Sequence, residues 1–225
     1  MGILKNPTKE YFGDTLRKED VININGLDVE IVSFTDNNGN FHKKGFKPKD
    51  GDNLKELLKR MIKVRGDEGD FNDIDTSEIE SMMLLFKGNE TFNGDITGWN
   101  LSEVTDMDYM FWNATSFNKP IGDWKFPNVK TICGMFKGAT SFNQDISKWE
   151  FPNVETMGGM FKGATSFNKP IGNWKFPKVS NMYGLFEGAT SFNQDISTWE
   201  ISGVFVLDNM FRNCPIKEEY KPKME

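Results

Sequence analysis

Residues 140–164 read TSFNQDISKWEFPNVETMGGMFKGA, and the large apolar residues of this stretch return every 25 positions along the chain. Tryptophan, isoleucine, valine and two series of phenylalanine keep this spacing. The members of these columns are Trp99, Trp124, Trp149, Trp174 and Trp199; Ile96, Ile121, Ile146, Ile171 and Ile196; Val104, Val129, Val154, Val179 and Val204; Phe92, Phe117, Phe142, Phe167 and Phe192; and Phe86, Phe111, Phe136, Phe161, Phe186 and Phe211. Self-similarity at one fixed period indicates a stack of copies of one structural unit rather than a globule around a pocket.

Each unit combines a strand pattern with a helical pattern. Residues 146–151 hold tryptophan and phenylalanine, which favour strands, and Pro152 halts the hydrogen-bond ladder. This pattern predicts a short strand. The side chains expected to face inward are Ile146, Trp149 and Phe151. Apolar residues then recur at a spacing of three to four, which predicts a helical turn or two over residues 157–162.

These elements predict an α/β solenoid. Because strands of successive coils run parallel, we expect a right-handed coil with a parallel sheet on one face and short helical turns opposite. Each coil hides little apolar surface alone, so stacking makes the core continuous. A column of asparagines is expected to hydrogen-bond the turn backbone in every coil. Its members are Asn93, Asn118, Asn143, Asn168 and Asn193.

The chain divides into three parts along its length. They are an N-terminal cap (1–70), the repeats (71–214) and a charged C-terminal tail (215–225). The cap combines a hairpin over 29–34 and 41–46 with an amphipathic helix over 52–64, for which Asp52 or Asn53 serves as N-cap. Such a cap covers the sheet edge that a stack of coils leaves open.

The repeats resemble the BspA-like leucine-rich-repeat surface proteins of bacteria, also called the mycoplasma lipoprotein repeat family. The elements FNQDISKW, NV-x-x-M and GMFKGATSFN carry this resemblance over residues 86–214, and residues 45–86 look like the family's lead-in. The resemblance implies a leucine-rich-repeat-like solenoid used for adhesion or protein contact, secreted or at the cell surface, with no catalytic residues. Residues 1–12, MGILKNPTKEYF, show neither the apolar stretch of a signal peptide nor a lipidation cysteine.

The composition excludes several classes of function. The net charge is −6 and the charges are interspersed, so we expect no nucleic-acid partner. The longest apolar runs are too short to insert into a membrane. The single histidine, His42, is interpreted as a surface residue, and no Walker loop, GxGxxG, GxSxG or CxxC motif occurs. We therefore expect no enzyme, no cofactor and no metal site, and both cysteines, Cys133 and Cys214, are expected to be free thiols.

Two aromatic residues break their columns and are candidates for partner binding. Trp112 stands where other coils carry charged residues, and Tyr109 stands where three coils carry glycine. Residues three apart on a helical turn share one side, so we expect the pair to form a contact surface. Packing under the cap or a neighbouring loop is the alternative.

A second candidate surface is the polar column beside the tryptophans. Its members are Lys125, Glu150, Lys175 and Glu200, whose alternating signs predict a cross-strand charge ladder. Phe205 and Val206 stand where earlier coils carry polar residues. We expect the C-terminal tail to cover them, and self-association is the alternative.

Together these patterns predict a non-enzymatic scaffold or adhesin-like module that binds another protein through the solenoid surface. The partner is unidentified, and a monomer is expected rather than a dimer. The alternative function is a carbohydrate-binding module that uses aromatic side chains.

Overall fold

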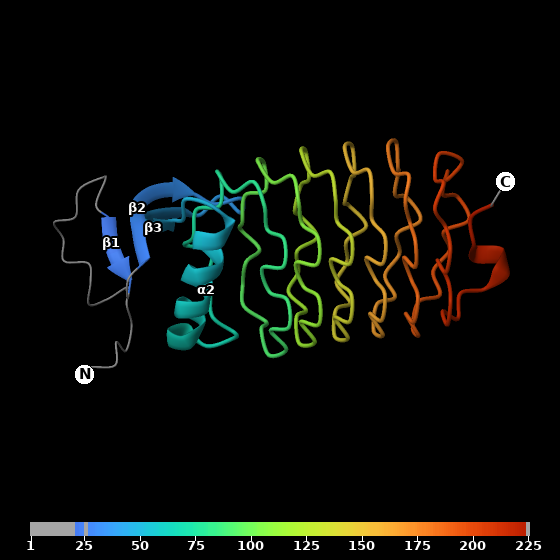
Figure 1. Cartoon of the computed structure of the whole chain (residues 1–225), viewed down its shortest axis with the longest axis horizontal. Coiled ribbons are helices and arrows are strands. Elements are labelled where there is room, and N and C mark those ends of the chain that lie inside the picture. The colour runs from blue at the N-terminus through green and yellow to red at the C-terminus, as the bar shows by residue number, and fades with distance from the viewer. Residues whose placement is uncertain (1–20, 25–26, 224–225) are drawn as a thin grey trace.

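The computed structural model describes residues 21–24 and 27–223 (Figure 1). Residues 1–20 and 25–26 of the expected cap and residues 224–225 of the expected tail lie outside the described residues. The cap begins with strands β1 (Val21–Ile24), β2 (Leu27–Thr35) and β3 (Phe41–Lys47), which pair antiparallel in the order β1-β2-β3. The predicted hairpin is confirmed as β2 and β3, and β1 adds a strand that was not predicted.

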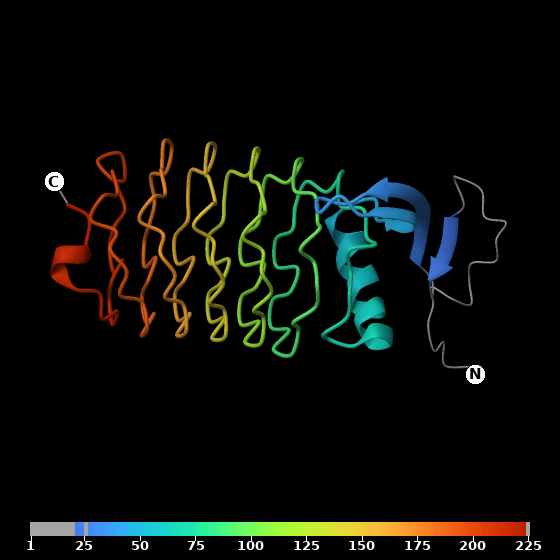
Figure 2. The same cartoon turned by 180° about the vertical axis from the view of Figure 1, so that it is seen from behind.

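Helix α2 (Gly51–Arg65) follows the sheet and lies against the first coil (Figures 1 and 2). Its N-cap is Asp50, whose Oδ1 accepts a hydrogen bond of 2.8 Å from the N–H of Asn53, so the predicted cap at Asp52 or Asn53 is wrong by two or three residues. The apolar face of α2 is buried. Its fully buried residues are Leu54, Leu57, Leu58 and Met61.

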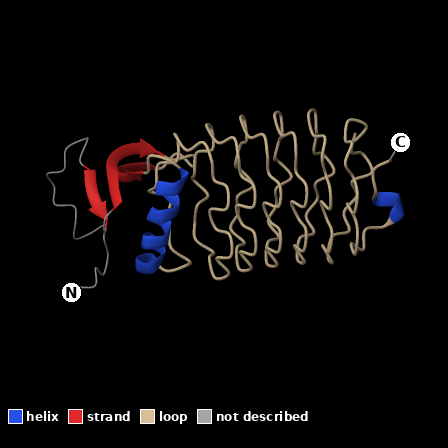
Figure 3. Ribbon diagram, in the orientation of Figure 1, coloured by secondary structure: helices blue, strands red, loops and turns tan. Residues whose placement is uncertain are grey.

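The repeats form coils that lie side by side along the molecule, with the cap at one end and the 3-10 helix η1 (Glu218–Tyr220) at the other (Figures 1 and 2). The expected α/β solenoid, leucine-rich-repeat-like with a parallel sheet on one face and short helical turns opposite, is wrong. Among the described residues, the strands are the three of the antiparallel sheet, and α2 is the one α-helix (Figure 3). Successive coils are joined by isolated parallel bridges, such as Thr131 to Thr156.

The predicted strand over residues 146–151 is instead a tight turn. The N–H of Trp149 donates to the carbonyl of Ile146 (3.1 Å), and the carboxylate of Asp145 accepts from the N–H of Ser147 (2.9 Å). Aspartate side chains favour such turns over extended backbone because they satisfy a local N–H group. The predicted inward direction of the side chains is confirmed, since Ile146, Trp149 and Phe151 are buried.

The hydrogen bonds between coils concentrate in one segment of each coil. We call residues 131–139, and the positions related to them by multiples of 25, the ladder segment. In this segment every second N–H donates to a carbonyl of the next coil, 24 residues later, as Gly134 does to Gly158 (2.8 Å) and Phe136 to Met160 (2.9 Å). Between them, the N–H groups of Met135, Lys137 and Ala139 turn back by three residues, as Lys137 does to Gly134 (3.0 Å).

Left-handed backbone at two columns of the ladder segment excludes the predicted helical turn over residues 157–162. Gly159 has φ 62° and Gly163 has φ 71°, and the equivalent residues of the other coils also have positive φ. A right-handed helix cannot continue through such residues, which glycine adopts most readily. The non-glycine members of these columns are Leu84, Tyr109, Asn113, Asn209 and Asn213.

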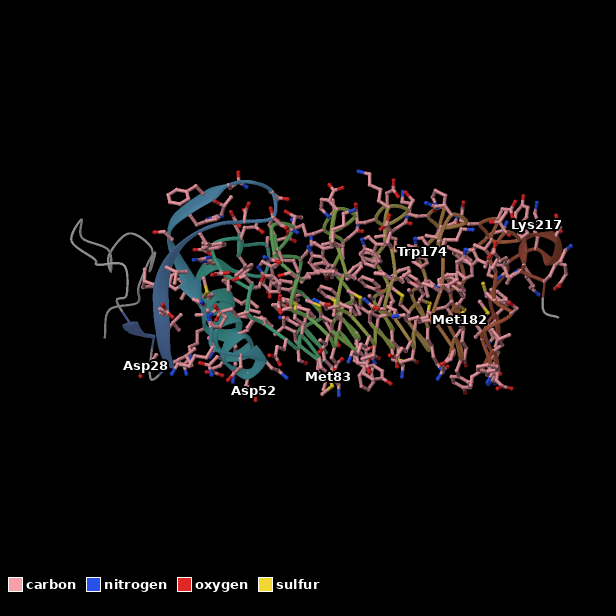
Figure 4. The ribbon with its side chains drawn as sticks, turned by 90° about the horizontal axis from the view of Figure 1, so that it is seen from above. Asp28, Asp52, Met83, Trp174, Met182 and Lys217 are labelled. Atoms are coloured by element: carbon pink, nitrogen blue, oxygen red, sulfur yellow. The ribbon has the colours of Figure 1, made fainter. Side chains whose placement is uncertain are left out.

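Phenylalanines fill the interior between coils. Phe136 and Phe142 of one coil stack with ring centroids 3.9 Å apart, and Phe136 lies parallel to Phe111 and Phe161 of the neighbouring coils at 5.5 and 5.7 Å. The side chains drawn in Figure 4 fill the spaces along the whole stack. Offset stacking of this kind adds to the free energy gained from burial, so the aromatic columns hold one coil on the next.

Polar groups inside the stack are satisfied by the neighbouring coil. The indole N–H of Trp174 donates to the carbonyl of Ile146 (3.1 Å), and Trp149 and Trp199 make equivalent bonds. The indole N–H of Trp124 is buried without a partner among the described residues. The asparagine column behaves as predicted, since Asn143 Oδ1 accepts from the N–H of Asn168 (3.0 Å) and each neighbouring pair repeats this bond.

The end of α2 is fixed to the first coil by one guanidinium group. Arg65 Nη1 and Nη2 each lie 2.7 Å from a carboxylate oxygen of Asp73, and Nη1 also donates to the carbonyl of Asp70 (2.6 Å). The guanidinium carbon lies 5.9 and 5.7 Å from the ring centroids of Phe46 and Phe71. This bidentate, mostly buried ion pair joins β3, α2 and the first coil.

Replacing Arg65 therefore tests how the cap is held. Arg65→Ala leaves the Asp73 carboxylate without its partner and should lower the free energy of unfolding by about 3 kcal/mol. Arg65→Lys should recover only part of this loss, because an ammonium group cannot form the bidentate contact. The measurement is urea unfolding followed by circular dichroism.

Lys59→Ala is the matched control for Arg65. The ion pair of Lys59 with Glu56 is exposed and 3.8 Å long, so its loss should cost under about 0.5 kcal/mol. Equal losses in Arg65→Ala and Lys59→Ala would contradict the role given to Arg65.

Candidate functional site

A groove of about 560 Å³ crosses three successive coils in the middle of the stack. It includes three of the four residues of the predicted charged column. The residues that line it are Lys125, Ser147, Lys148, Trp149, Glu150, Phe151, Pro152, Asn173, Lys175 and Pro177. Because consecutive coils contribute equivalent positions, the groove is a direct product of the 25-residue repeat.

The floor of the groove is rigid and apolar. Trp149 and Phe151 are both 2% exposed, and the ring of Phe151 meets the ring of Trp174 edge-on at a centroid distance of 4.8 Å. Asn173 is an exposed lining residue whose Nδ2 donates to the carbonyl of Ser147 in the preceding coil (2.8 Å). A preformed floor of this kind loses little entropy when a ligand binds.

The rim of the groove is mainly cationic. Lys125, Lys148 and Lys175 are exposed there, and Glu150 is the one carboxylate among the lining residues. Lys148 lies 3.0 Å from Asp123, and both side chains are exposed. In a chain with net charge −6, this rim is a local concentration of positive charge.

The predicted charge ladder forms only in part. Within this column, Lys175 and Glu200 are an ion pair at 3.9 Å, while the other neighbouring members form none. The side chains of Lys175 and Glu200 are 68% and 86% exposed, so the pair contributes little to stability. Lys125, Glu150 and Lys175 therefore remain accessible to a partner.

Tyr109 and Trp112 lie together, as predicted, on the ladder segment of one coil. Their ring centroids are 5.4 Å apart, and both side chains are half-buried. Tyr109 has φ 56°, a left-handed conformation that is unfavourable for an aromatic residue. Its ring lies over Gly134 of the next coil, where a Cβ atom would come within 2.4 Å of the ring. The glycine at 134 thus makes room for the tyrosine.

Both faces of the Trp112 ring are covered by lysines of the neighbouring coils. Lys87 Nζ lies 4.2 Å and Lys137 Nζ 4.7 Å from the ring centroid, distances typical of cation–π contacts. Further along the same column, Glu187 lies between Lys162 (2.7 Å) and Arg212 (3.8 Å). Trp112 and Glu187 each separate two cations that would otherwise repel, so Trp112 has a structural role that the column break did not reveal.

Phe205 and Val206 are left uncovered by the tail. Phe205 is 85% exposed and Val206 is 36% exposed. The tail turns instead toward another part of the last coils, where the N–H of Lys217 donates to Asn193 Oδ1 (3.1 Å) and the N–H of Ile196 donates to the carbonyl of Tyr220 (3.0 Å). The prediction that the tail covers Phe205 and Val206 is therefore wrong.

His42 is half-buried in the hairpin and contacts Asp36, a residue of the hairpin turn. Its Nε2 lies 2.9 Å from Asp36 Oδ2. Burial raises the pKa of Asp36, but hydrogen bonds from His42 and Asn40 outweigh burial and lower it overall. The turn touches the stack, because the N–H of Asn37 donates to the carbonyl of Gly98 (2.8 Å).

Residues 21–24 and 27–223 hold no group of three or more histidine, cysteine, aspartate or glutamate residues that could hold a metal ion. Over the same residues, no helix has the length and apolar character needed to cross a bilayer. Cys133 and Cys214 are free thiols, and burial raises the pKa of the Cys214 thiol.

Sequence reasoning missed the groove itself. It interpreted residues 146–151 as a flat strand, whereas the turn at Ser147 and Lys148 leaves a hollow between coils. The available signal was the aspartate before this turn, Asp145, and the proline after it, Pro152, because both residues favour turns.

A model of a protein family matches the chain over residues 52–164 and 121–221. The family is described as a Mycoplasma protein of unknown function, DUF285. The two overlapping matches include all of α2 except its first residue, and they cover the repeated coils and much of the tail. Neither a search of curated proteins nor a search of solved structures found a match.

Asp108, beside the aromatic pair, has a pKa above the ordinary value of 3.8, because burial disfavours its charged form and Asp106 repels it. Hydrogen bonds from Thr131 and from the N–H of Cys133 oppose this shift without cancelling it. The folded chain therefore binds this proton more tightly than the unfolded chain, so stability falls as pH rises from about 3.8 through the folded pKa.

Asp108→Asn should raise the melting temperature at pH 7 and leave it unchanged below pH 3, because an amide oxygen keeps both hydrogen bonds without the charge. Melting curves across this pH range test the prediction. Asp208→Asn is the control, since Asp208 occupies the same column and is exposed. A lower melting temperature for Asp108→Asn at pH 7 would show that the carboxylate stabilises the fold.

Proposed function

We propose that this chain, which belongs to the DUF285 family, is a non-enzymatic scaffold that binds an acidic segment of another protein in the groove between its coils. The observation that carries the proposal is the combination of an apolar aromatic floor with a lysine rim. The resemblance to BspA-like surface proteins, which implies adhesion or protein contact, supports the same class of function.

The groove matches a peptide segment in size and chemistry. Its volume of about 560 Å³ is large enough for several side chains, and it opens along three coils rather than into a closed cavity. Pro152 and Pro177 offer exposed apolar contact, while Lys125 and Lys175 stand at the rim to meet carboxylates. Lysine rims steer acidic partners and raise their association rate.

The aromatic side chains favour a protein partner over a carbohydrate. Sugars stack on exposed aromatic faces, but the five periodic tryptophans are at most 3% exposed. The ring of Trp112 has lysines on both faces. An acidic peptide does not need an open ring face, because its side-chain carboxylates bind the lysines of the rim directly.

Selection from a random dodecapeptide library on the immobilised chain tests the proposal. Bound peptides should be enriched in Asp and Glu beside apolar residues. Lys125→Glu combined with Lys175→Glu should weaken their binding by about 100-fold, since two rim contacts become repulsive. Fluorescence anisotropy with a labelled selected peptide gives the dissociation constants, and higher salt should weaken binding to the wild-type chain.

A control with the same change of net charge distinguishes the loss of contacts in the groove from the effect of the overall charge on binding. Lys55→Glu combined with Lys130→Glu alters two exposed lysines that do not line the groove. This control should bind selected peptides as the wild type does. Equal binding by both double variants, or selection of basic peptides, would refute the acidic-peptide groove.

A further inference from the structure

The last ladder segment leaves four backbone donors open at the C-terminal end of the stack. In the preceding coil, the N–H groups of Met182, Gly184, Phe186 and Gly188 donate to carbonyls of the last coil at 2.8–2.9 Å. The equivalent N–H groups one coil later have no acceptor among the described residues. They belong to Leu207, Asn209, Phe211 and Asn213, which we call the open edge.

The open edge also carries uncovered apolar surface. The equivalents of Leu207 and Phe211 in the preceding coil, Met182 and Phe186, are fully buried. Leu207 and Phe211 themselves are only partly buried. The Phe211 ring stacks on Phe186 at a centroid distance of 6.0 Å. Among the described residues, the one cation near this ring is Lys221, whose Nζ lies 5.6 Å from its centroid. An unpaired row of donors beside apolar side chains is the surface that an added strand covers.

The polarity of the open edge decides what fits on it. In each ladder segment, the carbonyl groups that accept hydrogen bonds face the preceding coil, and the N–H groups that donate them face the following coil. Two C-terminal ends of this chain would therefore oppose donors with donors. The carbonyl side of the first ladder segment is covered by α2, since a Cβ atom on Gly51 would come within 2.4 Å of the carbonyl oxygen of Ser81. Both observations argue against a second copy as the occupant of the open edge.

The tail covers one backbone donor at this end of the stack. Its Tyr220 supplies a carbonyl to the N–H of Ile196 (3.0 Å), which otherwise would also lack an acceptor. The tail does not reach the four donors of the open edge with any carbonyl of its described residues. In the free chain these solvent-accessible donors bond to water, and the carbonyls of a bound segment would replace that water.

We infer that the open edge binds a peptide segment of a partner protein as one more coil, with carbonyls of alternate residues accepting from Leu207, Asn209, Phe211 and Asn213. The segment runs parallel to the last ladder segment and places an apolar side chain on Phe211. This surface is separate from the groove, so it adds a second partner site to the scaffold.

A peptide with the sequence of an internal ladder segment is the direct probe. Residues 179–189, VSNMYGLFEGA, supply the carbonyls that the preceding coil uses within the chain. The fluorescein-labelled peptide should bind the full chain saturably in fluorescence anisotropy, and a scrambled peptide should not. In NMR hydrogen exchange, saturating peptide should slow the four open-edge amides by about tenfold or more.

Leu207→Pro removes one donor and part of an apolar side chain that packs against the core, and should weaken peptide binding about tenfold. Phe205→Ser, at an exposed position outside the open edge, should bind as the wild type does. The groove variant with Lys125→Glu and Lys175→Glu should also bind this peptide normally, so failure here is distinguishable from failure of the proposed function.

Three results would overturn the inference. The first is equal binding of the scrambled peptide, or of Leu207→Pro with an unchanged circular dichroism spectrum. The second is slow exchange of the open-edge amides in the free chain at every concentration, which would mean that the chain already covers them. The third is protection that grows with protein concentration without peptide, which would make a second copy the occupant.

Discussion

The whole stack depends on a backbone that alternates its hydrogen bonds. In each ladder segment, residues with positive φ turn every second N–H toward the next coil and leave the others to close turns of three residues. The direction of these bonds is the same in every coil. It makes one end of the stack an acceptor surface and the other a donor surface, and only the acceptor surface is covered by a helix.

This geometry separates the interior from the surfaces that can bind partners. Aromatic columns fill the interior, where each phenylalanine meets a ring of its own coil and rings of the coils before and after. Surface columns are free to vary, since their side chains contribute little to stacking. In the groove, three lysines and an aromatic floor come together because equivalent turns lie side by side. The groove is thus formed by columns of the repeat rather than by loops around an enclosed pocket.

The sequence predicted which residues are buried better than it predicted the backbone. The 25-residue period identified the buried tryptophans and phenylalanines, turn residues identified the hairpin, and the helical spacing of apolar residues identified α2. The strand predicted at 146–151 was wrong because Asp145 holds a tight turn there. The helical turn predicted at 157–162 was wrong because Gly159 and Gly163 adopt left-handed backbone that periodicity of apolar residues does not report. The four-residue spacing of these glycines was the available signal.

The candidate site was predictable only in part, for a related reason. The charged column containing Lys125 and Lys175 was found from the sequence, since it breaks the apolar pattern at a fixed position. The hollow beside it arises from turns whose shape the residue types do not fix. Trp112 was recognised as unusual, but its lysine neighbours come from coils 25 residues away on either side, and their side-chain directions follow from packing.

NMR detection of scalar couplings across hydrogen bonds tests this account most directly. The account predicts a coupling from the amide nitrogen of Gly134 to the carbonyl carbon of Gly158, and from Phe136 to Met160. A helical ladder segment would instead couple each amide to a carbonyl four residues earlier. That second pattern would contradict the alternating backbone, and with it both proposed binding surfaces.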